Sequence, residues 1–330
     1  MKAKKGILMC TAISFHAGDH YFGRNLDLEY SYEESVTVTP RGYPFFFADG
    51  EAMRSHHAMI GMAYISEGYP LYYDAVNEKG LAMAALAFPH EAVYHEKRAE
   101  KHNLAPFELI PYILGKCETV SQARDLLRNV NLWRRPFSAD LPLTPLHFII
   151  SDKKGSLTVE PTEKGLLLYE NPVGVLTNSP PFDFHMQYLN LFMGLSAEPI
   201  ENRFSKELPL KAFSRGMSAF GLPGDLSSSS RFVRAVFTKT HALAGKTEKE
   251  NVSQFFHILG AVEQQKGCVH LDGKYEYTVY SSCCNTERGI YYYTTYDDRR
   301  IVRADLHEYD LNGEMLTVCS SLCDNKHDFF

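Results

Sequence analysis

The most informative stretch of the sequence is Met9-Cys10-Thr11-Ala12-Ile13-Ser14-Phe15. Its β-branched and aromatic residues are typical of a strand, with a cysteine at its start. If everything before Cys10 is removed, this residue carries an α-amine with a pKa of about 7.7–8.0 and a thiol with a pKa of about 8.5. The amine can then accept the proton of the thiol, so one residue supplies both nucleophile and base. The alternative is that Cys10 is a small hydrophobic residue buried in a sheet.

Composition indicates a compact globular protein whose partner is a small molecule. The chain has 330 residues, of which 45% are hydrophobic and 22% charged, which is an ordinary globular balance. The formal net charge is -6 and is spread without a basic stripe, which argues against nucleic acid or a membrane surface as a partner. No stretch approaches the roughly 20 apolar residues of a membrane-spanning helix.

The cysteines and the first residues bear on compartment and maturation. Seven cysteines at irregular spacings form neither a disulfide framework nor a zinc motif, so we expect reduced thiols in a cytoplasmic protein without a bound metal. The apolar part of MKAKKGILM is shorter than the roughly 7–15 residues of a secretory signal. We expect residues 1–9 to be an N-terminal extension that is removed on maturation. Because no linker or internal repeat is evident, residues 10–330 are expected to form a single catalytic domain.

Blocks of strands and blocks of helices follow one another along the chain. This order lacks the β-α-β alternation of a parallel sheet, so we expect an α+β protein of antiparallel sheets with segregated helices. Ser121 is predicted to cap the second helix, and residues 227–230 to form a loop that caps the helix beginning at Arg231. The predicted strands are 11–15, 20–23, 35–40, 58–65, 81–88, 146–151, 157–160, 173–177, 276–282, 290–295 and 301–306; the predicted helices are 107–114, 121–130, 184–193, 231–243 and 252–262.

Arg24 and Asp27 occur where a strand after a short hairpin would return beside the first strand. Both side chains can then lie near Cys10. Asp27 could hold the α-ammonium group, while Arg24 could lower the pKa of the thiol and keep Asp27 ionised. The alternative is an exposed ion pair or a turn.

Asn178 and Arg231 are the remaining candidates for the site. Asn178 follows an apolar run and precedes Ser-Pro, where its amide can donate to a developing oxyanion or simply cap a turn. Arg231 lies at a predicted helix N-terminus, where a cation opposes the helix dipole and needs an anion. Asp27 is the partner we expect for it.

Seven blocks, taken together and in order, resemble the choloylglycine hydrolase family, which comprises bile salt hydrolases and penicillin V acylases among the N-terminal nucleophile hydrolases. The resemblance extends from Met9 to about residue 298. The blocks are Met9-Cys10-Thr11, GRNLDLEYSY at 23–32, TPR at 39–41, NEKGL at 77–81, LTNSP at 176–180, GLPGD at 221–225 and SRFVR at 230–234.

This resemblance implies a four-layer αββα sandwich and a cytoplasmic homotetramer. It also implies that processing exposes Cys10, and that Arg24, Asp27, Asn178 and Arg231 are catalytic. The implied reaction is hydrolysis of a carboxamide through a thioester, without metal or cofactor. An amine could intercept the same thioester, which would make acyl transfer a side activity.

One position departs from the family. Bile salt hydrolases typically have Asn, and penicillin V acylases often Tyr, where this chain has Ala87 in Ala-Leu-Ala-Phe-Pro at 85–89. The implied role of this position in the oxyanion hole is chiefly a backbone N–H, which alanine retains. Hydrolysis is therefore expected to survive, because only loss of an oxyanion donor outright would cost about 2.7–4 kcal/mol.

The expected substrate follows from two further runs of residues. The runs at 26–32 and 182–186 are more similar to bile salt hydrolases, so a glycine- or taurine-conjugated bile salt is the expected substrate. Penicillin V remains the alternative substrate, and an unprocessed, non-catalytic ligand-binding relative is the alternative of another class. A steroid needs an apolar cleft. Its candidate lining residues, which core packing explains equally well, are Phe15, Met62, Ile65 and Phe137.

Overall fold

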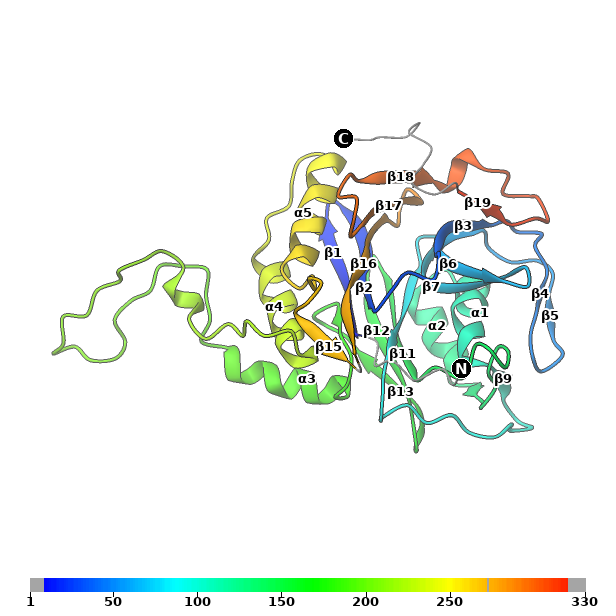
Figure 1. Ribbon diagram of the computed structural model, residues 1–330, viewed down its shortest axis with the longest axis horizontal. Helices are drawn as coiled ribbons and strands as arrows, with labels where there is room; N and C mark the ends of the chain where they lie inside the picture. Colours follow the sequence, from blue (N-terminus) through cyan, green and yellow to red (C-terminus); the bar gives the residue numbers. More distant parts are fainter. Residues whose placement is uncertain (1–8, 272, 320–330) are drawn as a thin grey trace.

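The structure, a computed structural model, describes residues 9–271 and 273–319; all of the predicted extension except Met9 lies outside these residues. Two large antiparallel sheets stack face to face, with helices on both outer faces (Figure 1). Helices α4 (Ser228–His241) and α5 (Glu248–Gly260) cover the first sheet, and α1 (Leu109–Lys116) and α2 (Val120–Leu127) cover the second. The predicted αββα sandwich is confirmed.

The first sheet carries the start of the described chain in its interior. Its strands run in the order β14 (Val175–Leu176), β1 (Met9–Ala17), β2 (Asp19–Leu28), β16 (Lys274–Asn285), β17 (Ile290–Thr295) and β18 (Val302–Asp305), with β15 (Val269–Leu271) paired to β16. Segments from both ends of the sequence therefore meet where β16 pairs with β2.

The second sheet is built mostly from the first half of the chain. Its order is β13 (Gly165–Glu170), β12 (Gly155–Thr162), β11 (Leu146–Asp152), β8 (Ala82–Ala87), β7 (Tyr69–Asn77), β6 (Met59–Ser66), β3 (Ser35–Thr39) and β19 (Thr317–Val318). Two small pairs lie outside it, β4 (Phe45–Phe46) with β5 (Ala52–Met53) and β9 (His102–Leu104) with β10 (Val130–Leu132).

The β1–β2 hairpin positions the residues that the sequence singled out. Gly18 makes the turn at a φ of 74°, a left-handed conformation that glycine adopts without strain. The register places Cys10 opposite Leu26 and Ala12 opposite Arg24. Gly23 is needed because a Cβ there would lie 1.9 Å from the carbonyl oxygen of Ser282 in β16. This close approach lets β16 pair along β2.

Hydrophobic side chains form two cores, one on each side of the second sheet. The larger core fills the space between the sheets and beneath α4 and α5, and the smaller one lies under α1 and α2. Two arginines, Arg24 and Arg231, are among the largest side chains that are fully buried. Because burying a cation is costly without partners, these residues mark a specialised region of the larger core.

Several helices begin earlier than the sequence predicted. Thr119, not Ser121, caps α2 by accepting a hydrogen bond from the Gln122 amide. Helix α4 begins at Ser228 rather than at Arg231; its N-cap residue is Ser227, and the Ser228 hydroxyl accepts a hydrogen bond from the Asn178 amide. Helix α3 (Phe182–Leu189) begins two residues early, and α5 is capped by Thr247.

The predicted strands all occur, but several others were missed. Strand β7 was missed because Pro70 and Asp74 interrupt an otherwise apolar and aromatic run. Strand β13 is only half-buried, so its leucines lacked a clear alternation. Within residues 9–271 and 273–319, no helix combines the length and the apolar character needed to cross a membrane.

Candidate active site

Cys10 lies near the start of β1, with its side chain in the space between the two sheets. Ser14, which projects from the same face of β1, accepts a hydrogen bond in this space from Ser151 of the second sheet. Continuing the register between β1 and β14 places Asn178 opposite Cys10. The Cys10 amide donates to Asn178 Oδ1 at 2.8 Å. Met9 still precedes Cys10, so this nitrogen is an amide without basic character.

Arg24 approaches Cys10 from the space between the sheets. Its Nη1 donates to the carbonyl oxygens of Tyr73, at 2.9 Å, and Ala85. Its Nε and Nη2 are buried and have no hydrogen-bond partner among the described residues. Burial raises the pKa of the Cys10 thiol, and the charge of Arg24 lowers it. Arg24 thus acts on the thiol in the predicted direction, although burial outweighs it in the chain that retains Met9.

Asp74 is a buried acidic residue whose charge acts on Arg24. It was not among the residues predicted from the sequence. Its carboxylate accepts hydrogen bonds from Tyr280 at 2.5 Å, Tyr291 at 2.7 Å and Ser282 at 3.1 Å. Its negative charge raises the pKa of Arg24, so it supports the cationic form of that side chain. An acidic residue within the buried run of β7 was the available signal, since such a residue needs partners.

Asp27 lies on the opposite face of β2 from Arg24, because the two are an odd number of residues apart. Its oxygens accept from Thr278 at 2.6 Å and Gln264 at 3.1 Å. Burial raises the pKa of Asp27 to about 6, while the charges of Arg231 and Arg24 and the bond from Thr278 oppose that rise. Asp27 is therefore mainly ionised above about pH 6.

Asp27 is the charge partner predicted for Arg231, since each side chain shifts the pKa of the other, but no hydrogen bond joins them among the described residues. Arg231 Nη1 donates to the Cys10 carbonyl oxygen and to Thr11 Oγ1, both at 2.6 Å. Its Nη2 donates to Asn178 Oδ1 at 2.7 Å. Asp27 acts on Arg231 only through its charge. Because α4 begins earlier than predicted, Arg231 lies one turn inside the helix, where it reaches the start of β1.

Asn178 joins several of these groups through its side-chain amide. Its Oδ1 accepts from both Cys10 and Arg231, which fixes the orientation of the amide. Its Nδ2 donates one hydrogen to the carbonyl oxygen of Ala87 at 2.8 Å. The second hydrogen is the one that can serve an oxyanion, as the sequence predicted.

Ala87 presents its backbone to the same region. The amide of Phe88 donates to the Pro145 carbonyl, so the neighbouring pair, Ala87 and Leu146, is a non-hydrogen-bonded pair of the antiparallel ladder. The N–H and C=O of Ala87 therefore point away from β11. The C=O accepts a hydrogen bond from Asn178 Nδ2. Because the N–H and C=O of one strand residue point to the same side, the Ala87 N–H also faces the side of Asn178. This geometry supports the predicted use of the Ala87 N–H.

Glu276 is a second acidic residue that the sequence reasoning missed. It is buried on the same face of β16 as Thr278 and accepts a hydrogen bond from the Met9 amide. Burial, with repulsion from Asp27, raises the pKa of Glu276 to about 8, against the opposing effects of the Met9 amide and Arg231. A glutamate in an otherwise buried strand was again the available signal.

Replacing Glu276 by glutamine is expected to make stability less dependent on pH in the chain that retains Met9. In the unfolded chain Glu276 loses its proton near its ordinary pKa of about 4.3, whereas the folded chain keeps that proton up to about pH 8. The unfolded state then binds fewer protons, so stability falls as pH rises through this window. Melting temperatures measured from pH 5 to pH 8 should show a gain for E276Q that grows with pH. A gain of equal size at every pH, or one matched by the exposed-site control E100Q, would contradict this account.

The four candidate substrate contacts fall into two pairs. Phe15 and Met62 are buried in the larger core, and Phe15 lies on the opposite face of β1 from Cys10. Ile65 and Phe137 are half-buried, and the ring of Phe137 packs 5.2 Å from that of Phe107. Contact with a substrate remains a prediction for all four, and the half-buried pair is the more accessible to a ligand from solvent.

Comparisons with known proteins match this chain over nearly its whole length. Residues 10–320 match a family described as linear amide C–N hydrolases, choloylglycine hydrolase family. A bile salt hydrolase/transferase from Lactiplantibacillus plantarum is 52% identical over 311 residues, which cover 94% of this chain and 96% of that protein. The family match begins at Cys10.

Solved structures agree with these matches. The fold is similar to a conjugated bile acid hydrolase from Clostridium perfringens, with a TM-score of 0.87, 34% identity, and coverage of 94% of this chain and 97% of that one. A penicillin V acylase from Agrobacterium tumefaciens has a TM-score of 0.73 at 20% identity, with 93% and 90% of the two chains covered. At that identity the second likeness concerns the fold alone.

Proposed function

The chain belongs to the choloylglycine hydrolase family of linear amide C–N hydrolases, and we propose that it hydrolyses glycine- or taurine-conjugated bile salts. The observation that carries the choice of substrate is the similarity to bile salt hydrolases along 94% of the chain. Penicillin V is the weaker candidate, since the acylase that acts on it is similar only in fold. The site residues are proposed from the geometry around Cys10.

In this proposal residues 1–9 are removed and residues 10–330 act as one catalytic domain. The new α-amine of Cys10 takes the proton of the thiol, and Arg24 stabilises the thiolate that forms. Asn178 Oδ1 already accepts from the Cys10 nitrogen, so it can orient the amine. The negative charge of Asp27 and the positive charge of Arg231 act on that nitrogen from the face of the first sheet that α4 and α5 cover.

The thiolate attacks the carbonyl carbon of the conjugate, and the carbonyl oxygen becomes an oxyanion. The N–H of Ala87 and the second Nδ2 hydrogen of Asn178 are the proposed donors to it. The α-ammonium gives its proton to the departing nitrogen of glycine or taurine, which leaves a thioester on Cys10. Water, deprotonated by the α-amine, then releases the bile acid. An amine in place of water would give acyl transfer.

Kinetics on protein of known mass test the proposed function. Intact mass spectrometry should show a chain that begins at Cys10. This preparation should have a higher kcat/KM for glycocholate or taurocholate than for penicillin V. A preference for penicillin V would favour the acylase alternative. A protein that retains residues 1–9 and binds bile salts without cleaving them would favour a non-catalytic relative.

We also propose that the protein is a cytoplasmic homotetramer. The six described cysteines are all unpaired, as in proteins of reducing compartments. The arm, residues 194–226, extends far from the sandwich before α4 begins (Figure 1). Its Phe204, Phe213 and Phe220 are 83%, 90% and 91% exposed. Aromatic side chains this exposed favour burial against another subunit.

Substitution of all three arm phenylalanines by serine is expected to lower the order of the assembly. Each phenylalanine offers exposed apolar area that a second copy would cover in the proposed tetramer, so its loss removes part of the association energy. Size-exclusion chromatography with light scattering should give a tetramer for the natural chain and smaller species for the variant. Leu243→Ser is the matched control, since Leu243 is 84% exposed outside the arm. A natural chain that runs as a monomer would contradict the proposal.

A further inference from the structure

The loop that carries Asn178 is held by groups that the proposed reaction does not use. This Asn178 loop, residues 177–182, connects β14 in the first sheet with α3. Two of its backbone groups, the Thr177 carbonyl and the Phe182 amide, bond to side chains of the second sheet. The loop is therefore tied across the interface between the two sheets.

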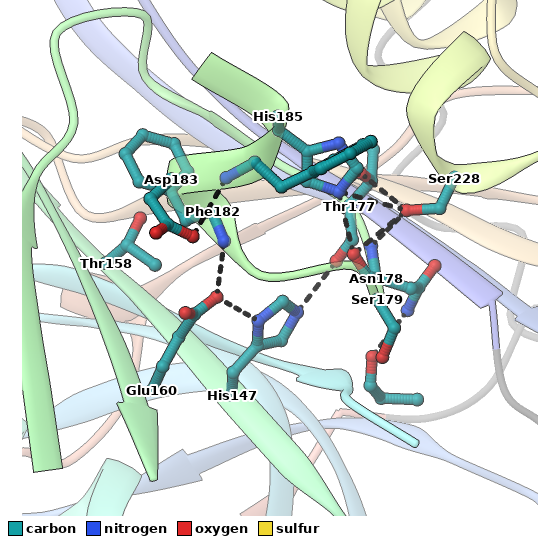
Figure 2. Close-up of polar contacts among 12 residues, drawn as sticks. His147, Thr158, Glu160, Thr177, Asn178, Ser179, Phe182, Asp183, His185 and Ser228 are labelled. Carbon is teal, nitrogen blue, oxygen red and sulfur yellow. Dashed lines mark hydrogen bonds and ion pairs between the residues drawn. The ribbon is translucent and has the colours of Figure 1, made fainter. Parts of the chain in front are cut away.

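His147 of β11 and Glu160 of β12 make these ties, and both are fully buried (Figure 2). His147 Nε2 lies 2.9 Å from the Thr177 carbonyl oxygen, and because a carbonyl only accepts, Nε2 carries the hydrogen. Its Nδ1 lies 3.2 Å from Glu160 Oε1. The same Oε1 accepts from the Phe182 amide at 3.0 Å. One proton must lie between Nδ1 and Oε1, since otherwise lone pairs would face each other.

The ring of His147 also contacts the strand that ends at Ala87. It stacks on the ring of Phe88 with centroids 4.3 Å apart and planes 7° from parallel. Phe88 follows Ala87, and Thr177 precedes Asn178. A single imidazole therefore contacts the immediate neighbours of both proposed oxyanion donors.

Asn178 is fixed on its other side by the helical layer. Its backbone amide donates to Ser228 Oγ at 2.9 Å, and its carbonyl oxygen accepts from His185 Nε2 at 2.9 Å (Figure 2). Burial lowers the pKa of His185 to about 4, so this ring is neutral near pH 7. The backbone of Asn178 is thus held from this side. From the other side, His147 fixes the position of the peptide group between Thr177 and Asn178.

We propose that His147, oriented by Glu160, is a positioning residue that sets the spacing between Asn178 and Ala87 in the oxyanion hole. The inference rests on the proposed function. A buried polar pair is weak evidence for stability, since apolar residues of the same size often serve as well. The buried pair His147 and Glu160 instead holds two oxyanion donors in a fixed geometry. That matters for catalysis, because a displacement of about 1 Å in a positioned group can lower the rate about 10²-fold.

Two substitutions of His147 separate its contacts. His147→Gln places an amide donor near the position of Nε2 and can keep the bond to Thr177. His147→Asn reaches only the position of Nδ1 and loses that bond. We expect H147N to lower kcat for glycocholate about 10²-fold with KM within about threefold, and H147Q to recover at least about tenfold of the loss. Equal losses in both variants, or wild-type kcat in H147N, would overturn the proposal.

A double-mutant cycle tests whether His147 acts through Asn178. In an Asn178→Ala background, H147N should lower kcat by less than about threefold, because the donor that it positions is already gone. Multiplication of the two separate losses would show that His147 acts elsewhere and would overturn the proposal.

Glu160→Gln provides a variant of the same shape should H147N fail to fold. One atom of Glu160 serves both His147 and the Phe182 amide, and neither end of a glutamine amide can replace it in both contacts. We expect kcat to fall about tenfold with KM unchanged. A wild-type kcat would overturn the role of Glu160.

Hydrogen exchange separates this proposal from the proposed function. Peptides that cover the Asn178 loop should exchange at least about tenfold faster in E160Q than in the natural chain, whatever the substrate. Unchanged exchange would overturn the positioning role even in an active enzyme. A natural chain without bile salt hydrolysis, but with faster exchange in E160Q, would refute the substrate and leave the positioning intact.

Discussion

Cys10→Ala is expected to lower kcat for glycocholate by about 10⁴- to 10⁶-fold, the range seen when a catalytic nucleophile is removed. Among the described cysteines, Cys10 is the one whose backbone nitrogen bonds to Asn178 and whose carbonyl oxygen bonds to Arg231. The substitution deletes the thiol that is proposed to form the thioester. It leaves the fold unchanged, since an alanine fits the space of a buried cysteine. The measurement is the initial rate of glycine release, on protein whose intact mass is known.

The control is Cys268→Ser, which changes an exposed cysteine outside the site and should keep the natural rate. Cys10→Ser is informative as well, because a hydroxyl is a far weaker nucleophile near neutral pH than a thiol. If Cys10→Ser, with its mass confirmed, hydrolysed glycocholate at the natural rate, Cys10 would not be the nucleophile.

Asn178→Ala is expected to lower kcat by about 10²- to 10³-fold, the usual cost of one lost oxyanion donor. The loss has a second source, because Oδ1 accepts from the Cys10 nitrogen and from Arg231. Truncation leaves the buried guanidinium of Arg231 with one acceptor fewer, so the melting temperature should fall too. Stopped assays for kcat and KM, with thermal melts on the same samples, measure both effects.

Asn178→Asp separates the two halves of the side chain. It keeps an acceptor for the Cys10 nitrogen and for Arg231 but has no hydrogen to offer the oxyanion or the Ala87 carbonyl. We expect it to retain the melting temperature better than Asn178→Ala while losing as much kcat. If Asn178→Asp kept the natural kcat, Asn178 would act only on the Cys10 nitrogen and the oxyanion role would be wrong.

Local sequence patterns were sufficient to predict the hairpin and the position of Arg24 near Cys10. A strand, a glycine turn and a second strand place Arg24 opposite Ala12, two residues from Cys10, and the register confirms it. Asn178 and Arg231 were also candidates from their local sequence, and the resemblance to the family placed them in the same site; they lie far from Cys10 in sequence but contact it in the structure.

Long-range pairings account for what could not be predicted. Strand β16 pairs with β2 and brings Glu276 and Thr278 to the site, while β7 of the facing sheet brings Asp74. No pattern within a short window of sequence predicts which strands become neighbours or in which register. The pairing of β16 with β2 even contains an irregularity between Thr278 and Tyr280. The hydrogen-bond partners of Arg231 were not predicted for a similar reason, because three serines belong to the helix instead of preceding it.

Met9 lies within β1, opposite Asp27, and its amide is bonded to Glu276. The surroundings of the Cys10 nitrogen are thus assembled while that nitrogen is still an unreactive amide. In the proposed maturation, breaking one peptide bond would create the base inside contacts that already exist. Activation would then need no movement of strands or loops. The precursor would then already have the active-site geometry of the mature enzyme. The rate of cleavage of the Met9–Cys10 bond would set the rate at which activity appears.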